Sequence, residues 1–182
     1  MTTRFHTAAA ILCLFLGLGS VSGFAADNRP LKGLSRLWVL IESLHPDLRK
    51  AGLTQDRLRE DIETRLRDAG IAVDSGKTLP GEPFLYLELS VLSGPDEAKP
   101  SRKRKAFRKD SSSAPSPIYV RLELQQGVVL KRDPSASLIT DTWHQTVIGY
   151  PEAGQVGEMC QSWARELTER FLKAYSAVNS AR

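Results

Sequence analysis

The chain has 182 residues, of which 25 are Lys or Arg and 21 are Asp or Glu, so its formal net charge is a modest +4. Cys13 lies in an apolar amino-terminal stretch, which leaves Cys160 as the single thiol of the remaining chain. This excludes an intramolecular disulfide, so stability must come from a hydrophobic core. A domain near 150 residues buries roughly 68–70% of its unfolded surface and needs no disulfide for stability.

Residues 1–25 have the three-part layout of a secretory signal peptide. Arg4 gives a positive start, an apolar block follows over 8–19, and small residues lead to Ala25. This block is short of the ~20 residues that a membrane-spanning helix needs, so we expect cleavage after Ala25 or one residue later. The alternative is an uncleaved membrane anchor. Because Cys13 lacks a lipoprotein processing context, we predict a periplasmic or secreted protein that is not a lipoprotein.

A first strand and a first helix are predicted after the leader. The apolar run 37–42 has strand length, and a turn-like stretch over 43–52 follows it. The period then becomes helical over 53–69, with Thr54 as the N-cap and Gly70 at the carboxyl end. The apolar residues of this helix recur at spacings of three and four and share one face: Leu58, Ile62, Leu66 and Ala69.

The central part of the chain alternates apolar and polar residues with period two, which predicts strands with one buried and one wet face. Residues 71–75 form a short strand, and 84–93, 118–132 and 138–150 form longer ones. The residues expected to point inward are Leu85, Leu87, Leu89, Val91, Ile118, Val120, Leu122, Leu124, Val128, Leu130, Ile139, Trp143 and Val147. Those expected to point outward include Tyr86, Glu88, Tyr119, Arg121, Glu123, Gln125, Thr142 and His144.

A long closing helix is predicted over 156–178, with a stripe of apolar residues that includes Trp163 and Phe171. The element order β-α-β-β-β-β-α predicts a single domain over 30–178 of the α+β class. We expect a two-layer α/β sandwich in which a four- to five-stranded mixed sheet carries both helices on one face.

Residues 94–117 contain a strongly basic run between two predicted strands. Their Pro, Gly and Ser content and the lack of large apolar side chains other than Phe107 predict a disordered hairpin loop. It is either a solubilising insertion or a contact for an anionic lipid or glycan of the envelope. A nucleic-acid partner is disfavoured, because export removes the protein from the cytoplasm and the basic run has no interleaved aromatic residues for base stacking apart from Phe107. The basic residues are Arg102, Lys103, Arg104, Lys105, Arg108 and Lys109.

Catalytic and metal-binding patterns are not found in the sequence. His45 lies in a loop, and His144 lies on an outer strand face without a metal-ligand spacing around it. Asp141 is expected to point to the face opposite His144. Cys160 belongs to the apolar stripe of the closing helix, which predicts a buried, inert thiol. We therefore predict no catalytic residues, no metal and no cofactor.

The outer sheet face is the remaining candidate surface. Tyr86, Tyr119, Arg121 and His144 would form a polar platform on it, which either faces water or receives a partner protein or glycan. We expect an exported, non-enzymatic binding or adaptor module of the cell envelope, without a membrane span in the mature chain. The rival hypothesis is a hydrolase of an envelope polymer that uses Glu88, Glu123 or His144.

Four stretches, residues 31–73, 83–92, 118–149 and 166–179, carry a pattern of apolar, Arg, Gly and Trp positions. By this pattern the chain resembles a group of uncharacterised small exported bacterial proteins. The resemblance implies no activity or catalytic residues, and the basic loop looks longer here than in that group. The topology also looks like small envelope domains, such as the lipopolysaccharide-transport plug lipoprotein and the amino-terminal domain of the Tol translocation protein.

Overall fold

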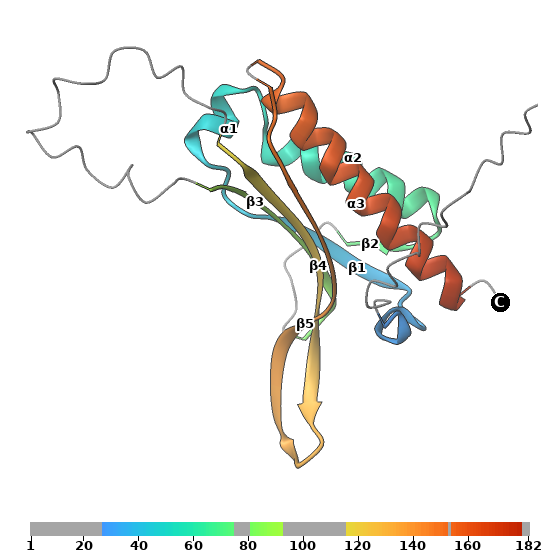
Figure 1. Cartoon of the computed structure of the whole chain (residues 1–182). Coiled ribbons are helices and arrows are strands. Elements are labelled where there is room, and N and C mark those ends of the chain that lie inside the picture. Colours follow the sequence, from blue (N-terminus) through green and yellow to red (C-terminus); the bar gives the residue numbers. More distant parts are fainter. Residues whose placement is uncertain (1–26, 75–80, 93–115, 153, 180–182) are drawn as a thin grey trace, which may run out of the picture.

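The computed structural model describes residues 27–74, 81–92, 116–152 and 154–179 (Figure 1). The predicted signal peptide over 1–25 lies outside these residues. The six basic residues over 102–109 that were predicted as a contact also lie outside them.

Five strands form one mixed sheet in the order β2-β1-β3-β4-β5. β1 (Arg36–Ile41) lies between β2 (Ala72–Val73) and β3 (Phe84–Val91) and runs parallel to both. β4 (Ile118–Leu130) pairs antiparallel with β3, and β5 (Asp133–Gly149) pairs antiparallel with β4. The predicted α+β class and the mixed sheet, expected with four to five strands, are confirmed.

Two helices cover one face of this sheet (Figure 1). α2 (Gln55–Asp68) begins after Thr54, whose hydroxyl accepts a hydrogen bond from the Arg57 backbone N–H at 3.3 Å. It ends before Gly70, which adopts a positive φ of 79° that favours glycine. α3 (Val156–Asn179) is the predicted closing helix.

The stretch 43–52, predicted as a turn, contains the short helix α1 (Pro46–Lys50). Pro46 suits the first helical position, because its fixed φ is helical and the missing N–H has no helical partner. His45 acts as the N-cap, and its Nδ1 accepts a hydrogen bond from the Asp47 backbone N–H at 3.3 Å. Leu48 is fully buried and joins the helix to the core. A 3-10 turn, η1 (Arg29–Leu31), precedes β1.

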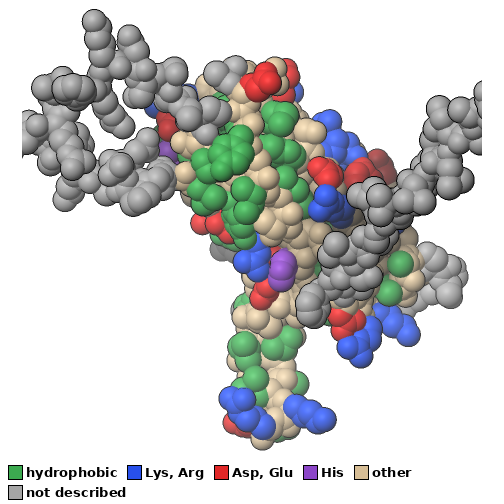
Figure 2. All heavy atoms as spheres, in the orientation of Figure 1, with side chains coloured by type: hydrophobic (Ala, Val, Ile, Leu, Met, Phe, Trp, Pro, Cys, Tyr) green, Lys and Arg blue, Asp and Glu red, His purple; other side chains and the backbone are tan. Residues whose placement is uncertain are grey.

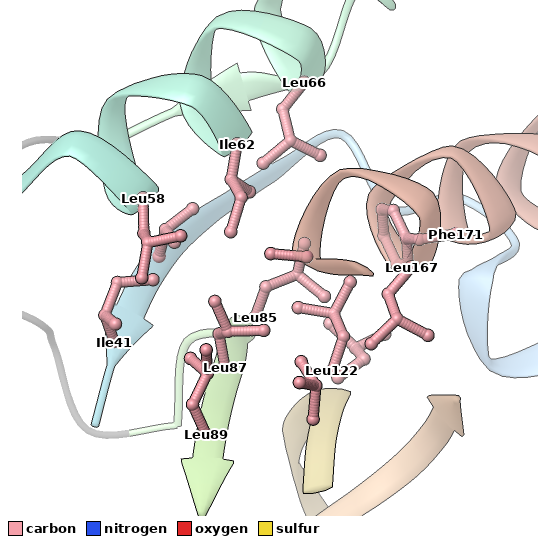
Figure 3. Packing of buried hydrophobic residues seen from close by; sticks show 14 of the residues in the cluster. Ile41, Leu58, Ile62, Leu66, Leu85, Leu87, Leu89, Leu122, Leu167 and Phe171 are labelled. Carbon is pink, nitrogen blue, oxygen red and sulfur yellow. The ribbon is translucent and has the colours of Figure 1, made fainter. Parts of the chain in front are cut away.

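The hydrophobic core fills the layer between the helices and the sheet, as Figure 3 shows. Trp143 and Leu122 are both buried there, as the alternation predicts. The Trp143 ring meets Phe171 edge-on, with a centroid distance of 5.2 Å. The labelled residues that interdigitate are Ile41, Leu58, Ile62, Leu66, Leu85, Leu87, Leu89, Leu122, Leu167 and Phe171.

β4 and β5 continue beyond the other strands as a two-stranded hairpin, residues 126–140, which we call the arm (Figure 1). The prediction that Ile139 points into the core is wrong, because 53% of this residue is exposed. The arm extends past the helix layer, so neither of its faces is covered as the sheet is. For the same reason Val128 and Leu130 are only half-buried.

A β-bulge interrupts the pairing of β4 with β5. Leu124 pairs with Trp143, but the next residue, Gln125, pairs with Asp141, so Thr142 is an extra residue on β5. The bulge reverses the alternation, and Asp141 therefore emerges on the same face as His144. The prediction that these two side chains point to opposite faces is wrong.

Candidate functional site on the open face of the sheet

The sheet face opposite α2 and α3 is the candidate functional site, and we call it the open face. All four predicted site residues among the described ones, Tyr86, Tyr119, Arg121 and His144, emerge there. The strand register lines them up in rows. One row joins Tyr86, Glu123 and His144, and the next joins Glu88, Arg121 and Thr146. Neighbours in such a row lie about 5 Å apart at Cβ.

Arg121 is the central charged group of the open face. Its Nε lies 2.8 Å from Glu123 Oε2, and its Nη2 lies 2.8 Å from Asp141 Oδ2. The Nε–H has no aligned hydrogen-bond acceptor, so its contact with Glu123 is an ion pair only. Burial alone would lower the pKa of Arg121, but Glu123, Tyr119 and Asp141 outweigh it and raise that pKa. The guanidinium thus binds two strands of the face together.

Asp141 also contacts His144, with its Oδ2 3.2 Å from the imidazole Nδ1. The carboxylate therefore lies between a guanidinium and an imidazole. This pair could not be predicted from the sequence, because Ile139, Trp143 and Val147 follow one uninterrupted alternation that hides the bulge.

Tyr86 and Glu42 form a second polar pair on the open face. Burial, a hydrogen bond to Glu42, and the negative charges of Glu88 and Glu123 together raise the pKa of Tyr86 to about 12. The phenol therefore stays neutral at physiological pH and acts as a hydrogen-bond donor. Glu42 follows β1 directly, and sequence reasoning placed it in the first strand without assigning it a role.

The open face is acidic, whereas sequence reasoning expected only a polar platform. Four carboxylates lie on β3, β4 and β5 or directly after β1, and the guanidinium of Arg121 contacts two of them. Glu123 is only 8% exposed and is neutralised by its ion pair. Glu88 accepts a hydrogen bond from the Ser90 hydroxyl at 2.8 Å. We call Glu42, Glu88, Glu123 and Asp141 the acidic cluster.

An aromatic pair borders the acidic cluster. Trp38 and Phe84 emerge side by side on the open face, with ring centroids 4.6 Å apart. The Trp38 Nε1–H is buried and has no hydrogen-bond partner. The face therefore offers carboxylates, a phenol and flat apolar rings within a few strands.

The other sequence candidates lie elsewhere. Cys160 is fully buried in α3, and burial raises the pKa of its thiol to about 11. His45 caps α1 on the molecule's periphery. In the described ranges, no group of three or more His, Cys, Asp or Glu side chains could hold a metal ion. No helix within those ranges is long and apolar enough to cross a membrane.

The chain matches no protein-family model and no curated protein. Among solved structures it is similar to a minor lipoprotein from Acinetobacter baumannii, with a TM-score of 0.24 and 8% sequence identity. The match covers 75% of this chain and 94% of that one. The resemblance to a group of exported proteins, and the absence of a lipid anchor, remain predictions from the sequence.

Proposed function

We propose that this protein is an exported, non-enzymatic binding module whose open face receives a basic segment of a partner protein in the cell envelope. The observation that carries the proposal is the acidic cluster on the uncovered side of the sheet. The signal-peptide pattern over 1–25 supports the location, periplasmic or secreted.

The charges of the open face favour a cationic partner. Arg121 forms ion pairs with Glu123 and Asp141, whereas Glu42 and Glu88 form no salt bridge within the described part of the chain. Complementary charge steers association and selects against wrong partners. The half-buried rings of Tyr86 and Tyr119 add surfaces on which Lys or Arg side chains can stack. An anionic lipid or glycan would instead be bound by the basic run over 102–109.

The experiment is capture from envelope fractions by chemical crosslinking to the tagged chain without residues 1–25. A double variant, Glu42→Gln with Glu88→Gln, removes two charges from the open face and leaves the Arg121 ion pairs intact. Its matched control, Glu152→Gln with Glu158→Gln, removes two exposed charges at and before the start of α3. We expect the wild type and the control to capture the same basic protein, and the face variant to lose it.

Salt gives a second criterion, because contacts between exposed charges weaken as ionic strength rises. A role of the acidic cluster would be refuted if the face variant still captured the partner. It would also be refuted if the control variant captured the partner as weakly as the face variant does.

The contact between Asp141 and His144 favours one rival, a hydrolase in which the carboxylate orients the imidazole. That reading requires a turnover of an envelope polymer that His144→Ala abolishes. The binding module instead predicts that His144→Ala alters capture while neither chain shows turnover.

A further inference from the structure

β5 is an edge strand of unusual length. It has 17 residues and, among the residues that the structure describes, pairs only with β4. Its outer side therefore presents a row of backbone N–H and C=O groups without strand partners. Such an edge is a template for pairing with another strand, and natural proteins commonly block it with Lys or other charged side chains.

The charged side chains that usually protect an edge are missing from β5. The strand has no Lys, Arg or Glu, and its two Asp residues are already engaged. Asp133 accepts hydrogen bonds from the backbone N–H and hydroxyl of Ser135, and Asp141 contacts Arg121 and His144. Pro134 blocks only the tip of the arm.

Exposed hydrophobic residues are concentrated on this same strand. The described part of the chain has six large hydrophobic residues that are exposed, and four of them lie on β5 or directly after it. Figure 2 shows hydrophobic side chains both on the arm and on the upper part of the molecule. The four residues are Leu138, Ile139, Ile148 and Tyr150.

We propose that β5 pairs antiparallel with β5 of a second copy about a two-fold axis at His144, joining the two sheets into one. The register follows from the bulge. With His144 opposite His144 of the partner subunit, the extra residue Thr142 shifts the pairing by one in both copies. Asp141 then faces Thr146 of the partner subunit, and Ile139 faces Ile148 of the partner subunit. All of these residues lie on the open-face side, as cross-strand neighbours must.

A second copy fits this edge better than an unrelated strand, because the strand is complementary to itself. Exposed Ile139 and Ile148 lie on either side of the axis, so the two-fold rotation brings Ile139 of each copy against Ile148 of the other. Pairing uses up the free edge of both copies, so the assembly closes at two. The base of the arm also gains support, since an isolated two-stranded hairpin is marginally stable and residues 138–140 would lie along the end of the partner's strand.

The dimer leaves the open face uncovered, so it is independent of the proposed binding function. It places the Asp141 and His144 pairs of both copies beside the axis, where the two acidic clusters become one continuous surface.

The test of the dimer is the mass in solution of the chain without residues 1–25, measured by light scattering and sedimentation equilibrium. The wild type is expected to be a dimer. Ile148→Lys removes the apolar contact with Ile139 of the partner subunit, which occurs twice in the dimer. The dissociation constant of the dimer should therefore rise roughly ten-fold or more. Val129→Lys is the control, because Val129 is a similarly exposed apolar residue, 63% exposed, but lies on β4 and away from the proposed interface. It should leave the dimer unchanged.

The register is tested by mixing two single-cysteine chains, Ile139→Cys and Ile148→Cys. The buried Cys160 stays out of reach of oxidants. We expect a disulfide-linked dimer from the mixture and none from either chain alone, while His144→Cys alone links to itself. A monomeric wild type would overturn the proposal. A dimer in which Ile139→Cys chains crosslink only to each other, and not to Ile148→Cys chains, would also overturn it.

Discussion

Arg121 shows how a charged residue can be structural on a surface that otherwise faces water. Its side chain is 28% exposed and its partner Glu123 only 10%, so both are largely removed from solvent. The attraction between two such charges offsets the free-energy cost of removing them from water only while both partners are present. Removing the guanidinium would leave Glu123 buried without a counter-charge and Asp141 with His144 alone.

We therefore expect Arg121→Met to lower the free energy of unfolding by about 2 kcal/mol, less than a fully buried pair would cost. Arg170→Met is the control, since Arg170 pairs with Glu166 on α3 where both side chains are nearly half-exposed. That change should cost at most about 0.5 kcal/mol. Urea denaturation of both variants measures the difference, and equal losses would show that the Arg121 contacts contribute no more than a surface pair.

At the level of elements, the limits of α2 could be predicted because short-range chemistry sets them. Thr54 supplies a side-chain acceptor, and Gly70 supplies a positive φ, both within one turn of the helix. α1 could not be predicted in this way, because five residues are too few to show a period. Its N-cap is His45, which is not among the residues favoured at that position.

The two faces of the sheet could be predicted only as far as the alternation is continuous. Along β3 and β4 every predicted orientation up to Leu124 holds, so the positions of Tyr86, Tyr119 and Arg121 followed from period two alone. On β5 the bulge at Thr142 moves Asp141 to the other face. The acidic character of the site was missed because Asp141 was assigned to the other face and because Glu42, which was placed in the first strand, was given no role.

The packing of α3 against the end of α1 limits which residue can stand at position 157. A Cβ built on Gly157 would lie 2.3 Å from the Ala51 carbonyl oxygen, a backbone atom that cannot move alone. Alanine is favoured over glycine inside a helix by about 1 kcal/mol. The clash should outweigh that gain.

We expect Gly157→Ala to destabilise the protein by about 1–3 kcal/mol, the range for overpacked sites. Ser162→Ala, at an exposed position of the same helix, should be neutral or slightly stabilising. Thermal unfolding of the two variants separates the effects. A Gly157→Ala chain that melts at or above the wild type would mean that α1 moves away freely.

At the scale of the whole molecule, the start and end of the described domain are held together by one side chain. Asn179, the last residue of α3, donates from Nδ2 to the Leu31 carbonyl oxygen at 2.9 Å. Its Oδ1 accepts from the Gly33 backbone N–H at 2.8 Å. These bonds connect positions almost 150 residues apart in the sequence. They fix η1, and with it the beginning of β1, beneath the carboxyl end of α3.

Asn179→Ala removes both bonds and leaves the Gly33 N–H without a protein partner among the described residues, whereas the Leu31 carbonyl oxygen keeps its bond from the Leu34 N–H at 3.3 Å. This change should cost about 1–2 kcal/mol. Lys173→Ala, at an exposed site one to two turns earlier, is the control and should change stability little. Urea denaturation measures the loss, and hydrogen exchange locates it. The Gly33 amide should exchange faster in Asn179→Ala, while amides of β3 and β4 change only with global stability. If Gly33 stays protected, η1 is held by the burial of Leu31 and not by the carboxyl end of α3.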